Sequence, residues 1–260
     1  MATLSELLPV EAIRLDAEAD DWTEAVRAAG DLMAATGTST GDYTAEMIAN
    51  VEENGPYIVI APGLAFAHAR PSPAVHRTGM SWVRLARPVA FGHEANDPVE
   101  LVVGLAARES AEHQAAMAAL ARLLADPATA DALRAAPTPD AVHAILSGEG
   151  ERGASAAGPA RGGGHGMHKI LTVCGNGVGT SLFLKNTLEQ VLDRWGWGPF
   201  VTVEATDTIS AKGKAGEAAA ILTSREIART LGELGVPVRV VEDFTSAAEV
   251  DRVLRTTYDV

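Results

Sequence analysis

The sequence has a single cysteine, few aromatic side chains and no long apolar run. Cys174 is the only cysteine among 260 residues, so the chain cannot form an internal disulfide. No apolar stretch approaches the roughly 20 residues needed to span a bilayer. The segment Met1–Glu11 lacks the basic start and apolar core of an export signal. These absences favour a folded protein in a reducing, cytoplasmic setting.

Positive charge is also scarce. The first 168 residues contain no lysine, and the net charge of the chain is −13. Residues 1–146 carry 20 acidic and 9 basic side chains, whereas residues 167–260 carry 12 and 10. Because an acidic surface repels a polyanion, the composition argues against a nucleic-acid partner. The uneven charge indicates two units with different partners, although solubility alone would also account for it.

One stretch of the chain has almost nothing to bury. Residues 147–166 are rich in glycine and alanine and show no helical or strand periodicity, which is typical of a flexible linker. Twenty such residues have a root-mean-square reach of roughly 25 Å. We therefore predict two domains, residues 1–146 and 167–260, joined by a tether that lets them meet and separate.

Both predicted domains mix helical and strand patterns, which indicates the α/β class. In the first, helices are expected near residues 22–33, 47–51, 110–124, 128–135 and 139–146, and strands at 57–60, 64–67, 80–85 and 99–105. This pattern predicts a mixed sheet flanked by helices. In the second, strands at 169–173, 200–204, 219–223 and 238–241 alternate with a helix that follows the loop ending at residue 181 and with helices at 224–234 and 246–255. That alternation predicts a doubly wound domain with a four-stranded parallel sheet.

Cys174 opens a glycine-rich loop between the first strand and the first helix of the second domain. The loop consists of Cys174, Gly175, Asn176, Gly177, Val178, Gly179, Thr180 and Ser181. Open α/β sheets bind ligands beyond the carboxyl end of a strand, and backbone N–H groups at a helix N-terminus favour an anion. The same surroundings favour the thiolate, the nucleophilic form of cysteine. We predict a phosphoryl-binding loop rather than a tight turn with a buried structural cysteine.

Three other loop chemistries fit less well. A nucleotide P-loop needs a lysine, and none lies between Lys169 and Lys185. The glycines do not follow the Gly-x-Gly-x-x-Gly spacing of a dinucleotide site. Low-molecular-weight tyrosine phosphatases carry an arginine six residues after the cysteine, where this chain has Thr180. Without that arginine rapid hydrolysis is not expected, so the pattern indicates a phosphoryl carrier rather than a phosphatase.

His68 is the candidate donor in the first domain. It ends a short apolar strand and is followed by Arg70 and Pro71. Neutral imidazole is a good nucleophile near pH 7, and phosphohistidine is a high-energy donor able to phosphorylate a thiolate. A surface histidine at a strand end is the alternative, but a phosphoryl-accepting cysteine on the same chain favours the donor role. Arg70 is close enough in sequence to contribute positive charge, and because strand side chains alternate between faces, residues 68 and 70 could share one.

His113 is the second histidine of interest. It follows the N-cap candidate Ser110 and shares one helical stripe with the apolar residues at 117, 120 and 124. We expect it at the sheet edge beside His68, donating a hydrogen bond to a phosphoryl oxygen; a half-buried histidine without such a role is the alternative. Three other histidines are expected at the surface: His76, His93 and His143. No pair has metal-ligand spacing, so neither a metal nor a cofactor is predicted.

These motifs resemble two modules of the bacterial phosphoenolpyruvate-dependent sugar phosphotransferase system. Residues 168–260, with their Cys-Gly-x-Gly-x-Gly-Thr-Ser loop, resemble the IIB domain of the lactose/galactitol/ascorbate-type branch. Residues 5–146 contain Pro-Gly-x-Ala-x-x-His-Ala-Arg-Pro around His68 and the turn Asn96-Asp97-Pro98-Val99. They resemble the IIA domain of the mannitol/fructose superfamily in its ascorbate-like branch.

The resemblance implies a relay. His68 would accept phosphate from the phosphocarrier HPr, and Cys174 would pass it to ascorbate or a related pentitol or hexitol in a membrane IIC permease. The protein would then associate peripherally with that permease, and His113 would match the second active-site histidine. Fructose and mannitol members carry an arginine in the preceding helix, where this chain reads Val-Glu-Glu-Asn at 51–54, which leaves Arg70 as the candidate cation.

Two questions stay open at this level. A phosphorylation-sensing regulatory module built from the same domains is the alternative function, although it would call for a DNA-binding element or further regulatory domains. The oligomeric state, including a homodimer, is not determined by the sequence.

Overall fold

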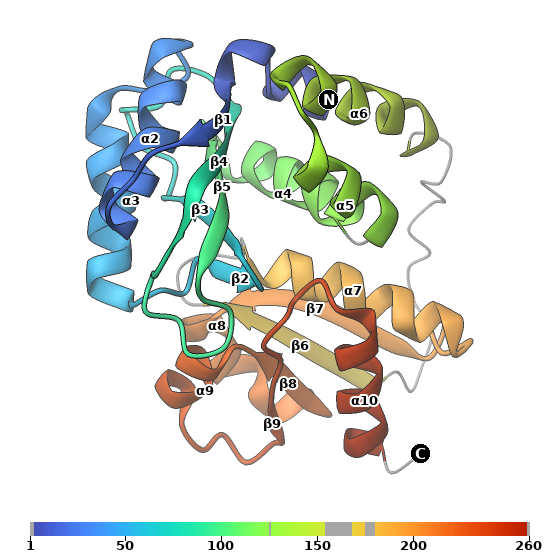
Figure 1. Ribbon diagram of the computed structural model, residues 1–260. Helices are drawn as coiled ribbons and strands as arrows, with labels where there is room; N and C mark the ends of the chain where they lie inside the picture. Colours follow the sequence, from blue (N-terminus) through green and yellow to red (C-terminus); the bar gives the residue numbers. More distant parts are fainter. Residues whose placement is uncertain (1–2, 125, 154–167, 175–179, 259–260) are drawn as a thin grey trace. The chain divides into compact units, whose positions relative to one another are not determined.

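The computed structural model describes residues 3–124, 126–153, 168–174 and 180–258 (Figure 1). Tertiary contacts divide the chain into two compact units, residues 1–157 and 158–260. Among the described residues, no helix is both long and apolar enough to cross a membrane.

The first unit is built on a mixed five-stranded sheet. Its strand order is β1-β4-β5-β3-β2. The strands are β1 (Ile13–Ala17), β2 (Val59–Ala61), β3 (Leu64–His68), β4 (Gly79–Val89) and β5 (Val99–Ala106). The pairs β1–β4 and β3–β5 are parallel, and the pairs β4–β5 and β2–β3 are antiparallel. The mixed sheet predicted from the sequence is therefore confirmed.

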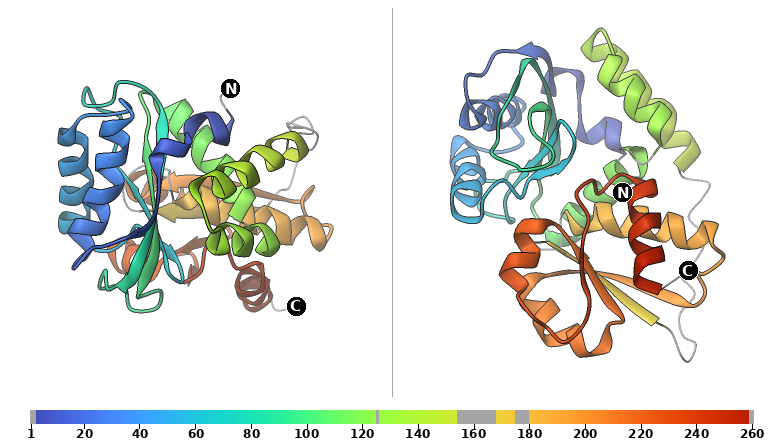
Figure 2. Two further views of the ribbon diagram at one scale, coloured as in Figure 1. Left: turned by 45° about the horizontal axis from the view of Figure 1, so that its top comes forward. Right: turned by 60° about the horizontal axis from the view of Figure 1, so that its bottom comes forward.

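Helices cover both faces of this sheet. One face carries α2 (Trp22–Ala35) and α3 (Gly41–Asn54), and the other carries α4 (Ser110–Leu124), α5 (Pro127–Ala135) and α6 (Pro139–Gly153) (Figures 1 and 2). Short helical segments at Leu4–Leu7 (α1) and Val10–Ala12 precede β1. With both faces covered, all five residues of β3 are buried. The side chain that ends this strand, His68, is thus held in the core of the unit.

The second unit is a parallel sheet with the order β7-β6-β8-β9. Its strands are β6 (His168–Cys174), β7 (Val201–Asp207), β8 (Ala220–Thr223) and β9 (Val238–Val240). On one face α7 (Ser181–Arg194) contacts α10 (Ala247–Tyr258); on the other lie α8 (Thr208–Lys214), a short turn at Ala215–Glu217 and α9 (Arg225–Leu231). The predicted doubly wound, four-stranded parallel sheet is confirmed. Because β7 and β8 flank β6, the order reverses at the carboxyl end of β6, where such sheets bind ligands.

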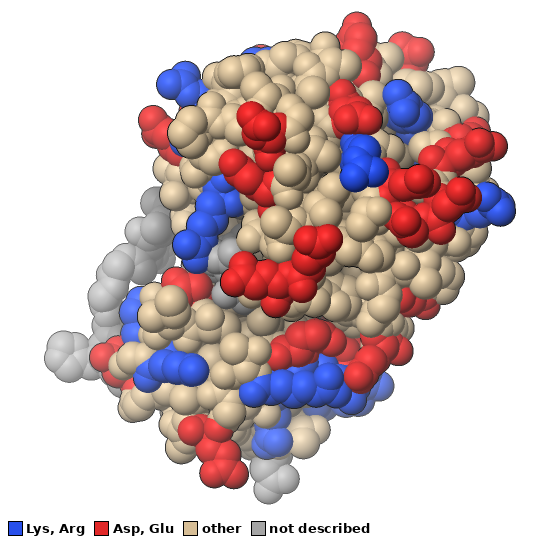
Figure 3. All heavy atoms as spheres, turned by 90° about the vertical axis from the view of Figure 1, so that its left-hand side faces the viewer, with Lys and Arg blue, Asp and Glu red and all other residues tan. Residues whose placement is uncertain are grey.

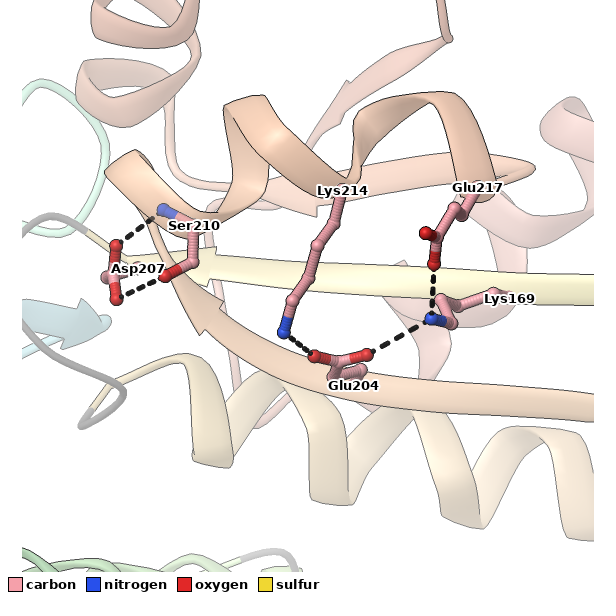
Figure 4. A network of polar contacts seen from close by, with 6 residues as sticks. All are labelled: Lys169, Glu204, Asp207, Ser210, Lys214 and Glu217. Atoms are coloured by element: carbon pink, nitrogen blue, oxygen red, sulfur yellow. Dashed lines mark hydrogen bonds and ion pairs between the residues drawn. The ribbon is translucent and has the colours of Figure 1, made fainter.

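Ion pairs connect α8 and the turn after it to strands β6 and β7 of this sheet. Glu204 on β7 pairs with Lys214 of α8 and, at 3.4 Å, with Lys169 on β6. Lys169 also pairs with Glu217 at 3.1 Å (Figure 4). These side chains are partly exposed, so each pair contributes little to stability. On the face of the molecule drawn in Figure 3, basic and acidic side chains are interspersed rather than gathered into a basic patch.

Three of the elements that differ from the sequence-based expectation are β1, α8 and α6. The edge strand β1 was not predicted, because its exposed Arg14 and its positive-φ residue Asp16 break the apolar alternation. The helix α8 was not predicted either, although Asp207 caps it by accepting the backbone N–H groups of Ile209 and Ser210. The helix α6 continues to Gly153, so residues 147–153, predicted as linker, are helical. Within this stretch the Ser147 hydroxyl donates to the carbonyl oxygen of His143, 2.9 Å away. The rest of the predicted linker, residues 154–166, lies outside the described part of the chain.

Candidate functional site

His68 occupies the last position of β3, opposite Leu105 on β5. Its side chain is only 4% exposed. Nδ1 lies 3.0 Å from the carbonyl oxygen of Phe66, and because a carbonyl can only accept, Nδ1 must carry the proton. The neutral ring therefore keeps its lone pair on Nε2, which is the nitrogen able to attack an electrophile.

The first turn of α4 brings His113 against His68. The two ring centroids are 5.4 Å apart and the rings are tilted by 57°. His113 is 8% exposed, and it shares the buried face of α4 with Met117, Leu120 and Leu124, as the helical stripe predicts. Its Nδ1 is buried and has no hydrogen-bond partner among the described residues. A buried polar atom without a partner is energetically costly. This nitrogen is therefore available to a hydrogen-bonding group that binds beside His68.

Burial keeps both imidazoles neutral. It lowers the pKa of His68, with the Phe66 hydrogen bond acting in the opposite sense. Burial, and secondly the proximity of His68, lower the pKa of His113 to about 3. The charged form of either ring would lose its hydration without gaining a counter-ion. At neutral pH the pair thus consists of the nucleophilic Nε2 of His68 and the uncharged imidazole of His113.

Aromatic rings complete the surroundings of His68, whereas Arg70 lies apart from the strand. Tyr57 meets the His68 ring edge-on with centroids 5.9 Å apart, and Phe66 lies at 5.4 Å. Arg70 is exposed and lies beyond the end of β3. The strand alternation that suggested a shared face for Arg70 and His68 therefore stops before Arg70, and a phosphate-binding role of Arg70 stays a prediction.

His93 was expected at the surface and is instead buried. It is 4% exposed, and its Nδ1 accepts hydrogen bonds from the backbone N–H groups of Ala95 and Asn96 at 3.3 and 3.1 Å. The adjacent Asp97 carboxylate accepts backbone N–H groups from Phe91 and two following residues. His93 is therefore a structural residue of this turn.

Cys174 is the last residue of β6 and lies at the switch point of the second sheet. It is 4% exposed, and its thiol donates to the hydroxyl oxygen of Ser181, 3.4 Å away. Ser181 is the first residue of α7 and Thr180 is its N-cap. The other members of the predicted loop, Gly175, Asn176, Gly177, Val178 and Gly179, lie outside the described residues.

The thiol of Cys174 differs from expectation in its acidity. Burial raises its pKa, and hydrogen bonding with Ser181 and Thr180 opposes that rise without reversing it. The sequence led us to expect a favoured thiolate, because it shows the loop and helix terminus but not how deeply the sulfur is enclosed. In the structure the protonated thiol is the favoured form, so the proton must leave when the sulfur reacts.

Several supporting residues escaped the sequence analysis. The Thr172 hydroxyl donates to the carbonyl of Ser181 at 3.0 Å, and the Thr223 hydroxyl donates to the carbonyl of Val173 at 2.7 Å. Both contacts fix the backbone on either side of the cysteine. Asp207 lies opposite Cys174 on β7 and turns its carboxylate to α8 (Figure 4). Thr172 and Thr223 share one signal, a polar residue in the last two positions of a predicted strand, whereas Asp207 lies beyond the predicted end of its strand.

The described side chains offer no metal centre. Within the part of the chain that the structure describes, no group of three histidine, cysteine, aspartate or glutamate side chains could hold a metal ion.

Comparison with known proteins defines the class. The family model described as phosphoenolpyruvate-dependent sugar phosphotransferase system, EIIA 2, matches residues 6–149. The model described as PTS system, lactose/cellobiose specific IIB subunit, matches residues 169–256. Fold and matches together make this protein a phosphotransferase built from two α/β units. The chain belongs to the EIIA 2 family of the sugar phosphotransferase system, and it carries a IIB unit fused behind the IIA unit.

Individual relatives agree with this assignment. The ascorbate-specific PTS system EIIA component of Salmonella choleraesuis (strain SC-B67) is 42% identical over 135 residues, 52% of this chain and 88% of that protein. The component of the same name from Escherichia coli (strain K12) is 41% identical over 137 residues, 52% of this chain and 89% of that protein. The solution structure of the mannitol-specific cryptic phosphotransferase enzyme IIA CmtB from Escherichia coli has a TM-score of 0.52 at 30% identity, covering 56% of this chain and 99% of that one.

Proposed function

We propose that the protein is a two-step phosphoryl relay in which His68 accepts the group and Cys174 receives it from His68. The first donor would be the phosphocarrier HPr, in keeping with the EIIA 2 family match. The segment between the two units would serve as a tether. By holding the units at a high effective concentration, a tether makes the internal transfer fast without a permanent interface.

The arrangement around His68 supports the first step. Nε2 carries the lone pair because Nδ1 donates to Phe66. As Nε2 forms a bond to phosphorus, the phosphorus–nitrogen bond of the donor breaks and its electron pair returns to the donor histidine. The unpaired Nδ1 of His113 can then donate to a phosphoryl oxygen once that nitrogen carries the proton. The ring contact between His68 and His113 supports His113 for this task.

In the second step the sulfur of Cys174 attacks the same phosphorus. The sulfur–phosphorus bond forms, the bond from phosphorus to Nε2 breaks, and the electron pair returns to Nε2. The thiol proton leaves to Nε2 and from there to water, since burial keeps His68 neutral. Thr180 and Ser181, at the start of α7, provide hydroxyls and a helix N-terminus for the transferred group.

The last acceptor would be a sugar presented by a membrane IIC permease, to which this protein would bind peripherally from the cytoplasm. Relatives that are 41–42% identical to the first unit bear the name ascorbate-specific, which favours ascorbate as that sugar. The observation that carries the proposal is the pair formed by His68 and His113: a neutral nucleophile with a defined tautomer beside an unpaired polar nitrogen.

Phosphate labelling of the full chain tests the relay. With phosphoenolpyruvate and the general phosphotransferase proteins, the wild type should carry label on both His68 and Cys174, located by mass spectrometry. His68→Ala should lose both labels, and Cys174→Ser should keep label on His68 alone. His76→Ala, which removes an exposed histidine of the same unit, should label like the wild type. Label on Cys174 in the His68→Ala chain would show that the proposed order is wrong.

A further inference from the structure

The hydroxyl of Tyr43 reaches the backbone on both sides of the His68 position. Tyr43 lies in the first turn of α3, and its side chain is fully buried. The phenolic oxygen is 2.9 Å from the carbonyl oxygen of Leu105, and 3.0 Å from both the nitrogen and the carbonyl oxygen of Ala69. The phenolic oxygen therefore accepts a hydrogen bond from the N–H of Ala69, and its single proton is shared between the two carbonyl oxygens.

These contacts occur where the sheet ladder stops. β3 ends at His68, so Ala69 is the first residue without a strand neighbour, and Leu105 is the residue opposite His68 on β5. Buried backbone groups at such a place need a substitute partner. A single side chain supplies it here, and it joins the residue that follows His68 to the residue that lies beside it.

We propose that Tyr43 is a positioning residue for phosphoryl transfer: its hydroxyl fixes the His68–Ala69 backbone and so holds the imidazole with Nε2 directed to the donor. This inference rests on the proposed function of His68. Two constraints then orient the ring. One is the Nδ1–H bond to Phe66 within the strand; the other is the set of hydrogen bonds that join the Tyr43 hydroxyl to Ala69 and Leu105, which we call the Tyr43 clamp. Burial raises the pKa of Tyr43, so the hydroxyl keeps its proton at neutral pH.

Tyr43 is distant from His68 in the sequence, and its hydroxyl affects the reaction only through the position of the imidazole. A misplacement of about 1 Å of a reacting group can slow a reaction roughly 100-fold. Removing the hydroxyl frees the Ala69 peptide, and His68 then samples orientations in which Nε2 no longer lies in line with the donor. Binding of the donor protein does not involve this buried oxygen, so the effect should appear in the turnover rate and not in donor affinity.

Tyr43→Phe in the full chain tests the clamp, because it removes one oxygen and keeps the ring. Thr44→Val is the matched control: it removes a neighbouring hydroxyl of the same helix that is buried and has no partner among the described residues. We expect Tyr43→Phe to slow phosphorylation of His68 by phospho-HPr about 10- to 100-fold in kcat, with KM within twofold. Thr44→Val should match the wild type within twofold in both constants.

Nuclear magnetic resonance of the unphosphorylated proteins gives a second readout that does not depend on the donor. The His68 Nδ1–H resonance should be sharp in the wild type and in Thr44→Val, and shifted or exchange-broadened in Tyr43→Phe. An unchanged resonance together with a wild-type kcat would overturn the proposal. If the wild type itself accepted no phosphate at His68, the proposed function would fail, whereas the resonance would still decide the role of Tyr43.

A variant with the hydroxyl retained covers the case in which Tyr43→Phe does not fold. 3-Fluorotyrosine at position 43 keeps the ring and the hydroxyl but changes the strength of its hydrogen bonds. The clamp predicts a shift of the His68 Nδ1–H resonance in this protein. An unshifted resonance would refute it.

Discussion

Replacing His113 by leucine should make the first unit less sensitive to acid. In the folded protein burial lowers the pKa of His113 to about 3, whereas an unfolded histidine titrates near 6.5. Below about pH 6.5 the unfolded chain therefore binds a proton that the folded chain refuses. Since unfolding then takes up protons, the free energy of unfolding falls as the pH falls through this window and is regained as the pH rises. Leucine has no proton to bind in either state.

The size of the effect follows from the two pKa values. Between pH 7.5 and pH 5.5 the unfolded histidine goes from about one-tenth to nine-tenths protonated while the folded one stays neutral, which costs about 1.4 kcal/mol. Continued to pH 3, the loss from this one group would reach about 4 kcal/mol. His68, whose pKa burial also lowers, adds a loss of the same sign. The wild type should thus lose more stability than His113→Leu over the same interval, by about 1.4 kcal/mol.

Native-state hydrogen exchange measures this in the full chain. Amides of β5 lie in the core of the first unit and report its unfolding separately from the second. The free energy from their exchange, taken at pH 7.5 and 5.5, should drop by about 1.4 kcal/mol less in His113→Leu than in the wild type. His76→Gln, which removes an exposed histidine of the same unit, should behave like the wild type. An equal drop in His113→Leu and wild type would refute the reasoning, as would direct observation of His113 taking up its proton near pH 6.

Two further predictions concern single packing and hydrogen-bond contacts. Ser181→Ala removes a hydroxyl that lowers the pKa of the Cys174 thiol. Alkylation by iodoacetamide at pH 8 should therefore slow by about tenfold, which corresponds to the loss of one hydrogen bond to a charged group worth about 1.4 kcal/mol. An unchanged rate would mean that this hydroxyl does not stabilise the thiolate. Gly30→Ala would place a methyl group in the space of the Thr44 side chain, where α2 and α3 meet, and should cost about 1–3 kcal/mol in thermal unfolding. Gly41→Ala, at a helical glycine with open space around it, is the control and should not destabilise; equal melting of the two variants would contradict the packing argument.

Much of the fold was predictable because local patterns and long-range packing agree. The stripe of His113, Met117, Leu120 and Leu124 predicted a buried helix face, and α4 buries it against the sheet. In the second unit, apolar strands alternating with helices left a parallel sheet as the natural arrangement, and its strand order puts Cys174 at the switch point. Where a pattern was weak, as in β1 with its exposed Arg14, the element went unpredicted.

The parts of the site that could not be predicted depend on contacts between distant positions. Tyr43 meets Ala69 and Leu105, which are 26 and 62 residues away, and nothing in its local sequence indicates those partners. The acidity of Cys174 likewise depends on enclosure by the folded unit. The exposed position of Arg70 reflects the end of β3 at His68, a boundary of one or two residues that periodicity does not determine.

Burial of both candidate nucleophiles bears on how a transferred group would be held. His68 and Cys174 are each 4% exposed, and each is uncharged in the favoured form. A phosphoryl group carries its negative charge into these enclosed places, so polar partners must replace the water it loses. Uncharged neighbours are present at both places: the imidazole of His113 beside His68, and the hydroxyls of Thr180 and Ser181 beside Cys174. Neutral donors bind phosphate less strongly than the fork of an arginine. A phosphoryl group held by neutral donors is therefore stabilised less on the protein, and it is transferred more readily to the next acceptor.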